Sequence, residues 1–281
     1  MDWRQLRKID AHVHLLPEEV HRANAGVENE FSAATAEGHT EWMERFQVEK
    51  AILMPFNDPS LLSAGSTVTA VHENLRQLCE RYPGKYIAFA DIDVRNPPKE
   101  SCAEIRRAFQ SSCFRGIKIH PGNTELNLDD VYNDYIFDLA EELNVPVAIH
   151  SYPSSQRKYD SGDPCAPARI SNLMRRHPGV QAIVCHLGGF QWRDCVGLDA
   201  YFDLSSILPD FVKEYGLKEA NRILRRFDVN RLLFATDWPC SRSLEPNAIL
   251  EQYCALLNAL DFSEEEAKQI AYRNIASLLA L

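Results

Sequence analysis

The sequence predicts a (β/α)8 barrel, and three observations support this fold class. Short apolar runs recur along all 281 residues and alternate with segments of helical periodicity. Several runs are nearly continuous in apolar character, such as residues 180–185, which is typical of parallel strands buried on both faces. No GxGxxG loop follows any of them, which disfavours the alternative of a doubly wound open sheet.

The chain is expected to form one domain over residues 1–281. Its length alone would permit two domains, but α/β barrels of roughly 250 residues are common. No Gly/Ser-rich linker and no internal repeat divides the sequence. A single barrel is therefore the simpler interpretation.

The apolar and β-branched runs predict eight strands. They are expected at residues 8–14, 49–55, 86–94, 114–121, 145–151, 180–187, 200–205 and 231–237. Two connections exceed the usual length of a loop that leads from a strand to a helix, namely residues 17–38 and 152–164. Both would lie on the catalytic face, as substrate-gating elements or as plain surface insertions.

Amphipathic patterns predict the helices between these strands. Apolar side chains share one helix face at Val68, Val71, Leu75 and Leu78, and more loosely at Tyr132, Tyr135, Leu139 and Leu143. The tetrapeptide that begins at Ser263 has the pattern of a capping box. We expect it to open a final helix that runs through Leu278.

Composition narrows the range of partners. The formal net charge is −10, and basic residues cluster only in short pairs, which argues against nucleic acid and anionic membranes as partners. The N-terminus shows no signal peptide, and no apolar run approaches the roughly 18 residues of a membrane helix. Eight cysteines without CxxC spacing fit free thiols in a reducing compartment, so we expect a cytoplasmic protein.

The first predicted strand carries a row of polar side chains. Successive side chains on a strand point to opposite faces, so Asp10, His12 and His14 share one side. Two imidazoles about 7 Å apart along a strand can close on one metal ion. Asp10 is expected to be a structural partner of the histidines and not a ligand.

Other polar residues recur at the carboxyl ends of the predicted strands, where barrel enzymes place their catalytic groups. These residues are Lys118, His120, His150, His186 and Asp237. Each one alone has a structural explanation, because single histidines, interior lysines and turn-capping aspartates are common. Their joint placement favours a functional site. The remaining histidines, at 21, 39, 72 and 177, lie in predicted loops or helices and receive no role.

Five motifs, in this order along the chain, resemble those of the amidohydrolase superfamily, in its amidohydrolase 2 branch of metal-dependent barrel hydrolases and decarboxylases. They are residues 10–14 with Pro17, residues 116–121, residues 148–150, residues 185–189 and residues 233–239. The resemblance covers nearly the whole chain. It also implies a (β/α)8 barrel.

The resemblance implies a ligand set and a chemistry. His12, His14, His150 and Asp237 would hold a divalent metal ion, usually Zn²⁺, with Mn²⁺ or Fe²⁺ possible. Asp237 would take a proton from the metal-bound water. His186 would polarise the substrate carbonyl or stabilise the developing oxyanion.

Lys118 leaves two interpretations open. In some binuclear amidohydrolases, a carboxylated lysine on the fourth strand bridges two metal ions. We favour Lys118 and His120 as pocket residues that face the substrate or order the metal ligands. A lysine there would attract a substrate carboxylate, and Arg157 is a weaker candidate for the same task.

Two neighbouring families fit less well. The PHP phosphoesterases share the Asp-x-His-x-His start but end in an Asp-x-His ligand pair, where this chain has Pro239. The TatD-type nucleases have a glutamate where this chain has Ala235, and they act on nucleic acid.

The resemblance, together with the residue set, implies a hydrolase that attacks an amide, ester or lactone through a metal-bound hydroxide. The substrate would be a small molecule, and one that bears a carboxylate is favoured. The alternative is a non-oxidative decarboxylase of an aromatic or unsaturated acid, because the opening motif also resembles aminocarboxymuconate-semialdehyde-decarboxylase-like proteins. A non-catalytic metal-binding protein is a third class, and the intact residue set argues against it. A homodimer is a further expectation, since dimers are the commonest assembly.

Overall fold

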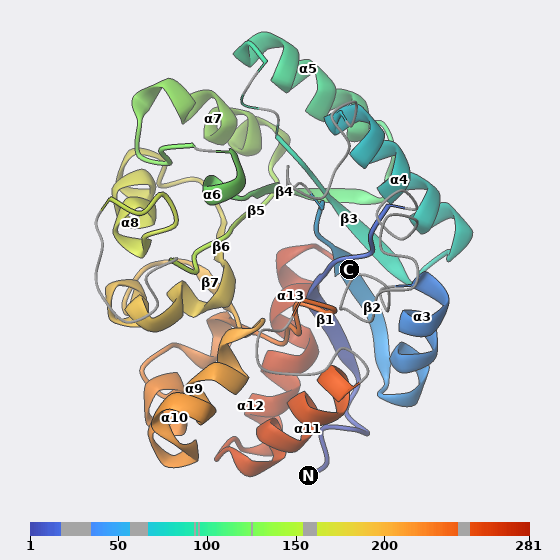
Figure 1. Cartoon of the computed structure of the whole chain (residues 1–281), viewed down its shortest axis with the longest axis vertical. Helices are drawn as coiled ribbons and strands as arrows, with labels where there is room; N and C mark the ends of the chain where they lie inside the picture. The colour runs from blue at the N-terminus through green and yellow to red at the C-terminus, as the bar shows by residue number, and fades with distance from the viewer. Residues whose placement is uncertain are drawn as a thin grey trace, which may run out of the picture.

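The protein is a (β/α)8 barrel, as predicted (Figure 1). The structure is a computed structural model that describes residues 1–17, 35–56, 67–92, 94, 96–124, 126–153, 162–240 and 248–281. Its eight strands are β1 (Lys8–Val13), β2 (Val48–Leu53), β3 (Tyr86–Ala90), β4 (Phe114–Ile119), β5 (Val147–Ile149), β6 (Ala182–Val184), β7 (Tyr201–Asp203) and β8 (Leu232–Leu233). Each strand pairs in parallel with the next one in the chain. All eight predicted strands are therefore confirmed.

The chain after β8 lies against β1. The amide of Ala11 donates to the carbonyl of Phe234 at 2.9 Å, and the amide of Asp237 donates to the carbonyl of His12 at 2.9 Å. The amide of His14 donates to the carbonyl of Trp238 at 2.7 Å. These bonds join the chain after β8 to the first strand and place Asp237 beside the two histidines. The strand β8 is shorter than the predicted strand at 231–237.

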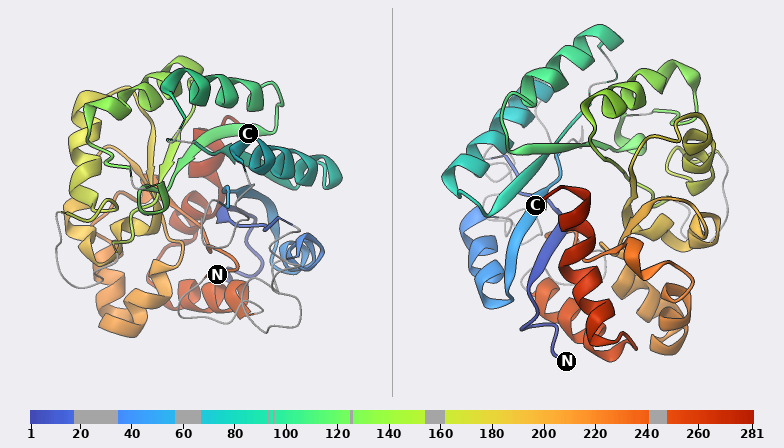
Figure 2. Two further views of the ribbon diagram at one scale, coloured as in Figure 1. Left: turned by 45° about the horizontal axis from the view of Figure 1, so that its top comes forward. Right: turned by 180° about the vertical axis from the view of Figure 1, so that it is seen from behind.

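Helices surround the sheet in the views of Figures 1 and 2. They are α3 (Ala36–Arg45), α4 (Val68–Arg81), α5 (Pro98–Ala108), α6 (Pro121–Thr124), α7 (Asp134–Leu143), α8 (Pro167–Arg176), α9 (Ile207–Tyr215), α10 (Leu217–Leu224), α11 (Ile249–Ala259), α12 (Glu264–Lys268) and α13 (Asn274–Leu278). The expected capping box is present, because the Ser263 hydroxyl accepts from the amide of Glu266 and the Glu266 carboxylate accepts from the amide of Ser263. The last predicted helix is continuous along the chain, but a π-helical turn at Gln269–Arg273 divides it into α12 and α13.

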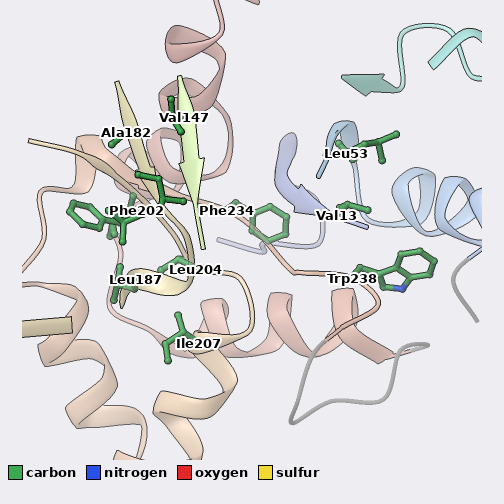
Figure 3. Close-up of a cluster of buried hydrophobic side chains, with 14 of the residues drawn as sticks. Val13, Leu53, Val147, Ala182, Leu187, Phe202, Leu204, Ile207, Phe234 and Trp238 are labelled. Carbon is green, nitrogen blue, oxygen red and sulfur yellow. The ribbon is translucent and has the colours of Figure 1, made fainter. Parts of the chain in front are cut away.

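Apolar side chains cover both faces of the strands, as expected for a parallel barrel. Inside the barrel, Ala148 of β5 and Ile183 of β6 belong to a cluster that also contains Ile275 of α13 and Leu279, the residue after that helix. The alternate residues point outward and pack against the helices. Figure 3 shows part of this outer layer, with Val147, Ala182, Phe202, Leu204 and Ile207.

Three further expectations can be compared with the structure. All eight cysteines are free thiols. Within the described residues, no helix combines the length and apolar character that crossing a membrane requires. The two long predicted loops lie largely outside the described residues, which omit 18–34 and 154–161.

Candidate metal centre

Asp10 joins the two segments that carry the site. Its carboxylate accepts hydrogen bonds from the amides of His12 at 3.2 Å and Thr236 at 3.1 Å, and from the Thr236 hydroxyl at 2.6 Å. Burial raises the pKa of Asp10 to about 7. The side chain thus ties β1 to the chain after β8, which agrees with the structural role expected for it.

Three predicted ligand side chains converge on one point. The Nε2 atoms of His12 and His14 lie 3.2 Å apart, and Oδ1 of Asp237 lies 3.2 Å from the first and 3.4 Å from the second. Donor atoms about 2.0–2.1 Å from a tetrahedral zinc ion are separated from one another by about 3.4 Å. The spacing and the chemistry of these donors therefore fit a single divalent ion.

His12 is held in the form that a metal ligand needs. Its Nδ1 lies 2.9 Å from Oδ2 of Asp203, an arrangement in which Nδ1–H donates and Nε2 keeps its lone pair. Burial and, to a lesser degree, the charge of Lys118 lower the pKa of His12 to about 4. The ring is therefore neutral at physiological pH, with its free nitrogen facing His14 and Asp237.

Asp237 carries the negative charge of the group. Burial would raise the pKa of this carboxyl, but the neighbouring His12, His14 and His186 rings hold it below its usual range. Its second oxygen, Oδ2, accepts a hydrogen bond from the Ser206 hydroxyl at 2.6 Å. Oδ1 is thereby left to face the two imidazoles.

Sequence reasoning missed Asp203, which lies at the end of β7. It accepts from Nδ1 of His12, from the amide of His186 at 2.7 Å and from the Ser205 hydroxyl. The side chain is fully buried. A polar residue directly after two aromatic strand residues, Tyr201 and Phe202, was the signal that could have revealed it.

His186 begins a segment with unusual backbone angles. His186 and Leu187 have φ values of 58° and 53°, and Asp237 has a φ of 64°. A left-handed backbone conformation costs free energy in residues other than glycine, and such residues concentrate at functional sites. Gly188 continues the turn at a φ of 77°, where an added Cβ would lie 2.5 Å from Sγ of Cys195. The backbone strain thus coincides with two predicted catalytic residues.

The His186 side chain lies between His150 and the group formed by His12, His14 and Asp237. Its Nδ1 is 3.0 Å from the carbonyl oxygen of Ser205 and 4.0 Å from Oδ2 of Asp237. Its Nε2 is 3.0 Å from Nδ1 of His150. His186 could also serve as a metal ligand, because His12, His186 and Asp237 offer donor atoms within 4.8 Å of one another.

His150 takes a different position from the other predicted ligands. It contacts His186 through Nδ1, and its ring stacks on His120 with centroids 3.8 Å apart and planes at 17°. It is thus linked to His12 and Asp237 through His186. Its assignment as a ligand stays a prediction.

Of the residues predicted to bind substrate, Lys118 and His120 contact the histidines of the site. Nζ of Lys118 is 3.5 Å from Nε2 of His12 and 3.1 Å from Sγ of Cys185, and the side chain is buried. His120 lies one residue beyond β4 and stacks on His150. Arg157 lies outside the described residues.

The described histidines without a predicted role make structural contacts elsewhere. His39 contacts the Tyr86 hydroxyl at 3.1 Å, His72 contacts Glu104 at 2.8 Å, and His177 contacts Asp134 at 3.1 Å. His21 lies outside the described residues.

A parallel eight-stranded barrel with histidines and an aspartate at its strand ends is typical of amidohydrolase-type proteins. A family model described as amidohydrolase matches residues 9–281. The chain therefore belongs to the amidohydrolase 2 family, as its motifs predicted. A comparison with curated protein sequences found no match.

Solved structures share the fold at low sequence identity. A 5-carboxyvanillate decarboxylase from Novosphingobium aromaticivorans, complexed with manganese, has a TM-score of 0.72 and 16% identity over 99% of this chain and 97% of its own. A dihydroxybenzoic acid decarboxylase from Polaromonas sp., also with bound manganese, has a TM-score of 0.71 and 16% identity over 99% and 98%. A protein named as a probable 2-pyrone-4,6-dicarboxylic acid hydrolase from Acinetobacter baumannii has a TM-score of 0.69 and 14% identity over 98% and 100%.

Proposed function

We propose that this protein is a metal-dependent hydrolase of an amide, ester or lactone bond in a carboxylate-bearing small molecule. The observation that carries the proposal is the convergence of His12, His14 and Asp237 within 3.4 Å of one another. These residues, with His150 as the predicted fourth ligand, would hold a divalent ion. Nitrogen and carboxylate ligands suit Zn²⁺, and the manganese of two similar structures makes Mn²⁺ the second choice.

Each side chain of the site has a task in this chemistry. When bound, a divalent ion acts as a Lewis acid and lowers the pKa of water from 15.7 to about 7. Asp237 is ionised at neutral pH and accepts the proton of the attacking water at its carboxylate. His186 donates from Nδ1 to the carbonyl of Ser205, and as the imidazolium, with a second proton on Nε2, it would stabilise charge on the substrate carbonyl oxygen. Lys118 supplies a positive charge for a substrate carboxylate.

Decarboxylation is the second candidate function. Two of the similar structures are decarboxylases of aromatic acids, and both hold manganese. The same ligands would serve this chemistry, because in both reactions the site stabilises charge that develops on the substrate.

A product assay on the metal-loaded protein tests the proposal. We expect a panel of lactones, amides and phenolic acids to give a new carboxylate without carbon dioxide; release of carbon dioxide would instead identify the decarboxylase. His186→Asn should retain the metal and lose about 10²-fold or more in kcat, because it removes a charge-stabilising group. His177→Ala, which lies outside the site, is the matched control. Unchanged turnover in His186→Asn would remove that residue from the mechanism.

The cellular compartment, the partners and the assembly of the enzyme are also part of the proposal. We infer a cytoplasmic enzyme that acts on a small molecule, without a nucleic-acid or membrane partner, because the net charge is −10 and the cysteines are free thiols. A homodimer is its expected assembly.

A further inference from the structure

Two cysteine side chains face each other at the end of the barrel opposite the candidate metal centre. Cys79 lies in the last turn of α4, and Cys113 lies in the turn that leads into β4. The Cys79 thiol donates a hydrogen bond to Sγ of Cys113. Because Cys113 precedes β4 whereas His120 follows it, the pair lies at the amino ends of the strands. The proposed mechanism gives neither thiol a task.

The two thiols differ in their access to solvent. Cys79 packs in the outer hydrophobic layer and is 8% exposed, whereas Cys113 is half-buried. The carbonyl of Cys113 accepts from the amide of Ala88 in β3 at 2.8 Å, and its Sγ lies 3.2 Å from the Ser111 hydroxyl. The pair therefore combines one shielded thiol with one that a small solute can reach, in a turn that is fixed to the sheet.

A cavity of about 370 Å³ lies beside this turn. Its lining includes Ser111 and Phe114, which precede and follow Cys113 in the chain, and Arg107 of α5. A molecule of the size of water occupies only about 30 Å³ in the liquid. The cavity thus has room for a small oxidant in the neighbourhood of Cys113.

The hydrogen bond between the thiols determines which sulfur atom reacts first. The bond from Cys79 lowers the pKa of Cys113, although burial opposes this shift, and the Ser111 hydroxyl lowers the pKa further. The same bond raises the pKa of Cys79, and burial adds to that increase. Since the thiolate is the reactive form, Cys113 is the attacking sulfur and Cys79 is the resolving thiol.

We propose that Cys79 and Cys113 form a redox-active dithiol that a hydroperoxide converts reversibly into a disulfide. The Cys113 thiolate attacks the hydroxyl oxygen of the peroxide and becomes a sulfenic acid. The O–O bond breaks, and the other oxygen leaves as an anion that takes a proton from solvent. The Cys79 sulfur then attacks the sulfenic sulfur, and the sulfenic oxygen leaves as water with the Cys79 proton. Two thiols are thus oxidised by two electrons, which reduce one peroxide.

The disulfide would tie α4 to the turn before β4. The two sulfur atoms must approach to about 2.05 Å, and the closed loop then spans residues 80–112, which include β3 and α5. A cross-link of this kind restricts the unfolded chain, so the oxidised protein should unfold at a higher urea concentration than the reduced protein. Disulfides of reducing compartments are typically transient and redox-sensing, which fits a reversible pair.

Brief treatment of the purified protein with hydrogen peroxide tests the inference. We expect two of the eight free thiols to disappear and a tryptic digest to contain a peptide that links Cys79 to Cys113. Dithiothreitol should restore all eight thiols. Cys79→Ser should prevent the link and leave Cys113 as a sulfenic acid that dimedone traps. Cys102→Ser, which changes a half-buried cysteine of α5, is the matched control and should keep the link.

The outcomes are independent of the proposed function, because none of these measurements uses the metal centre or turnover. Eight thiols that survive a peroxide dose sufficient to oxidise free cysteine would overturn the inference. A link between any other two cysteines, or between two molecules, would also overturn it. Peptide mapping uses the wild-type protein, so the result holds even if a serine variant fails to fold. Equal urea midpoints for the oxidised and reduced proteins would contradict the tie between α4 and β4.

Discussion

At the scale of single residues, Asp203 connects the two halves of the candidate centre. One carboxylate receives Nδ1–H of His12 and the main-chain amide of His186. It therefore orients a predicted metal ligand and also holds the strained turn on which a predicted catalytic residue lies. Partners of this kind, which do not touch the ion, commonly affect metal affinity as much as some ligands do.

Replacing Asp203 by Asn should weaken zinc binding by about 10- to 100-fold. The amide cannot hold the His12 tautomer with a negative charge, so the free nitrogen is presented less often. Equilibrium dialysis against zinc measures the change. Asp199→Asn, an exposed carboxylate two residues before β7 that pairs with Arg231, is the control. Equal affinity in the Asp203 and Asp199 variants would contradict the orienting role.

His39 should make the free energy of unfolding depend on pH. Burial lowers the pKa of this ring to about 3, against an ordinary value near 6.5. Below pH 6.5 this histidine binds a proton in the unfolded chain but stays neutral in the folded protein. The free energy of unfolding therefore decreases as the pH falls towards 3. Between pH 7.5 and 4.5 this loss amounts to about 3 kcal/mol.

His39→Leu removes this contribution, and chemical denaturation at both pH values measures it. The Tyr86 hydroxyl keeps Thr40 as a partner in the variant, with 3.1 Å between the two oxygens. The other buried histidines titrate equally in both proteins and cancel in the comparison. Identical pH dependence of the two proteins would show that His39 does not titrate in this way.

At the scale of elements, a glycine of β4 lets this strand pack closely against a side chain of β3. An added Cβ at Gly116 of β4 would lie 2.5 Å from the ring of Phe89 on β3, and Phe89 is fully buried. The barrel interior is close-packed, so the ring has no free space into which it can move. A glycine here is a packing requirement and not a turn signal.

Gly116→Ala should lower the free energy of unfolding by about 1–3 kcal/mol, because it overpacks the barrel interior. Urea denaturation measures the change. The added substitution Phe89→Leu should cost less in the Gly116→Ala background than in the wild type, since it relieves the clash. Strict additivity of the two substitutions would mean that the methyl group is accommodated elsewhere.

At the scale of the whole molecule, a metal ion would link the first and last strands. His12 and His14 belong to the β1 segment, whereas Asp237 follows β8. An ion held by these residues would bridge the segments that the hydrogen bonds of Ala11, His14 and Asp237 already join. Metal binding and barrel closure should therefore be coupled.

Zinc should raise the free energy of unfolding by about 2.7 kcal/mol when its free concentration is 100 times the dissociation constant. Thermal or urea denaturation with zinc and with a chelator measures the difference. The double variant His12→Ala with His14→Ala should lose this stabilisation, and His177→Ala should keep it. A wild-type protein whose stability does not respond to any divalent metal would argue against the site.

Sequence periodicity was sufficient for the architecture and for much of the site. Alternation along the predicted strand at 8–14 put His12 and His14 on one face, and the barrel topology placed Asp237 at a strand end near them. These inferences hold because the strand repeat of two residues and the order of strands are local or topological properties. Asp203 was missed because a single aspartate after two aromatic strand residues is a weak signal that many structural residues share.

The sequence alone therefore determined the barrel, the family and the residue types that can bind a metal. The tertiary structure decided which of those residues face one another. It brought His12, His14 and Asp237 within 3.4 Å, linked His150 to His186 and His120, and set the thiol of Cys79 against Cys113. The reason is physical: strand ends converge by topology, whereas individual side-chain contacts depend on local backbone angles and close packing across distant segments.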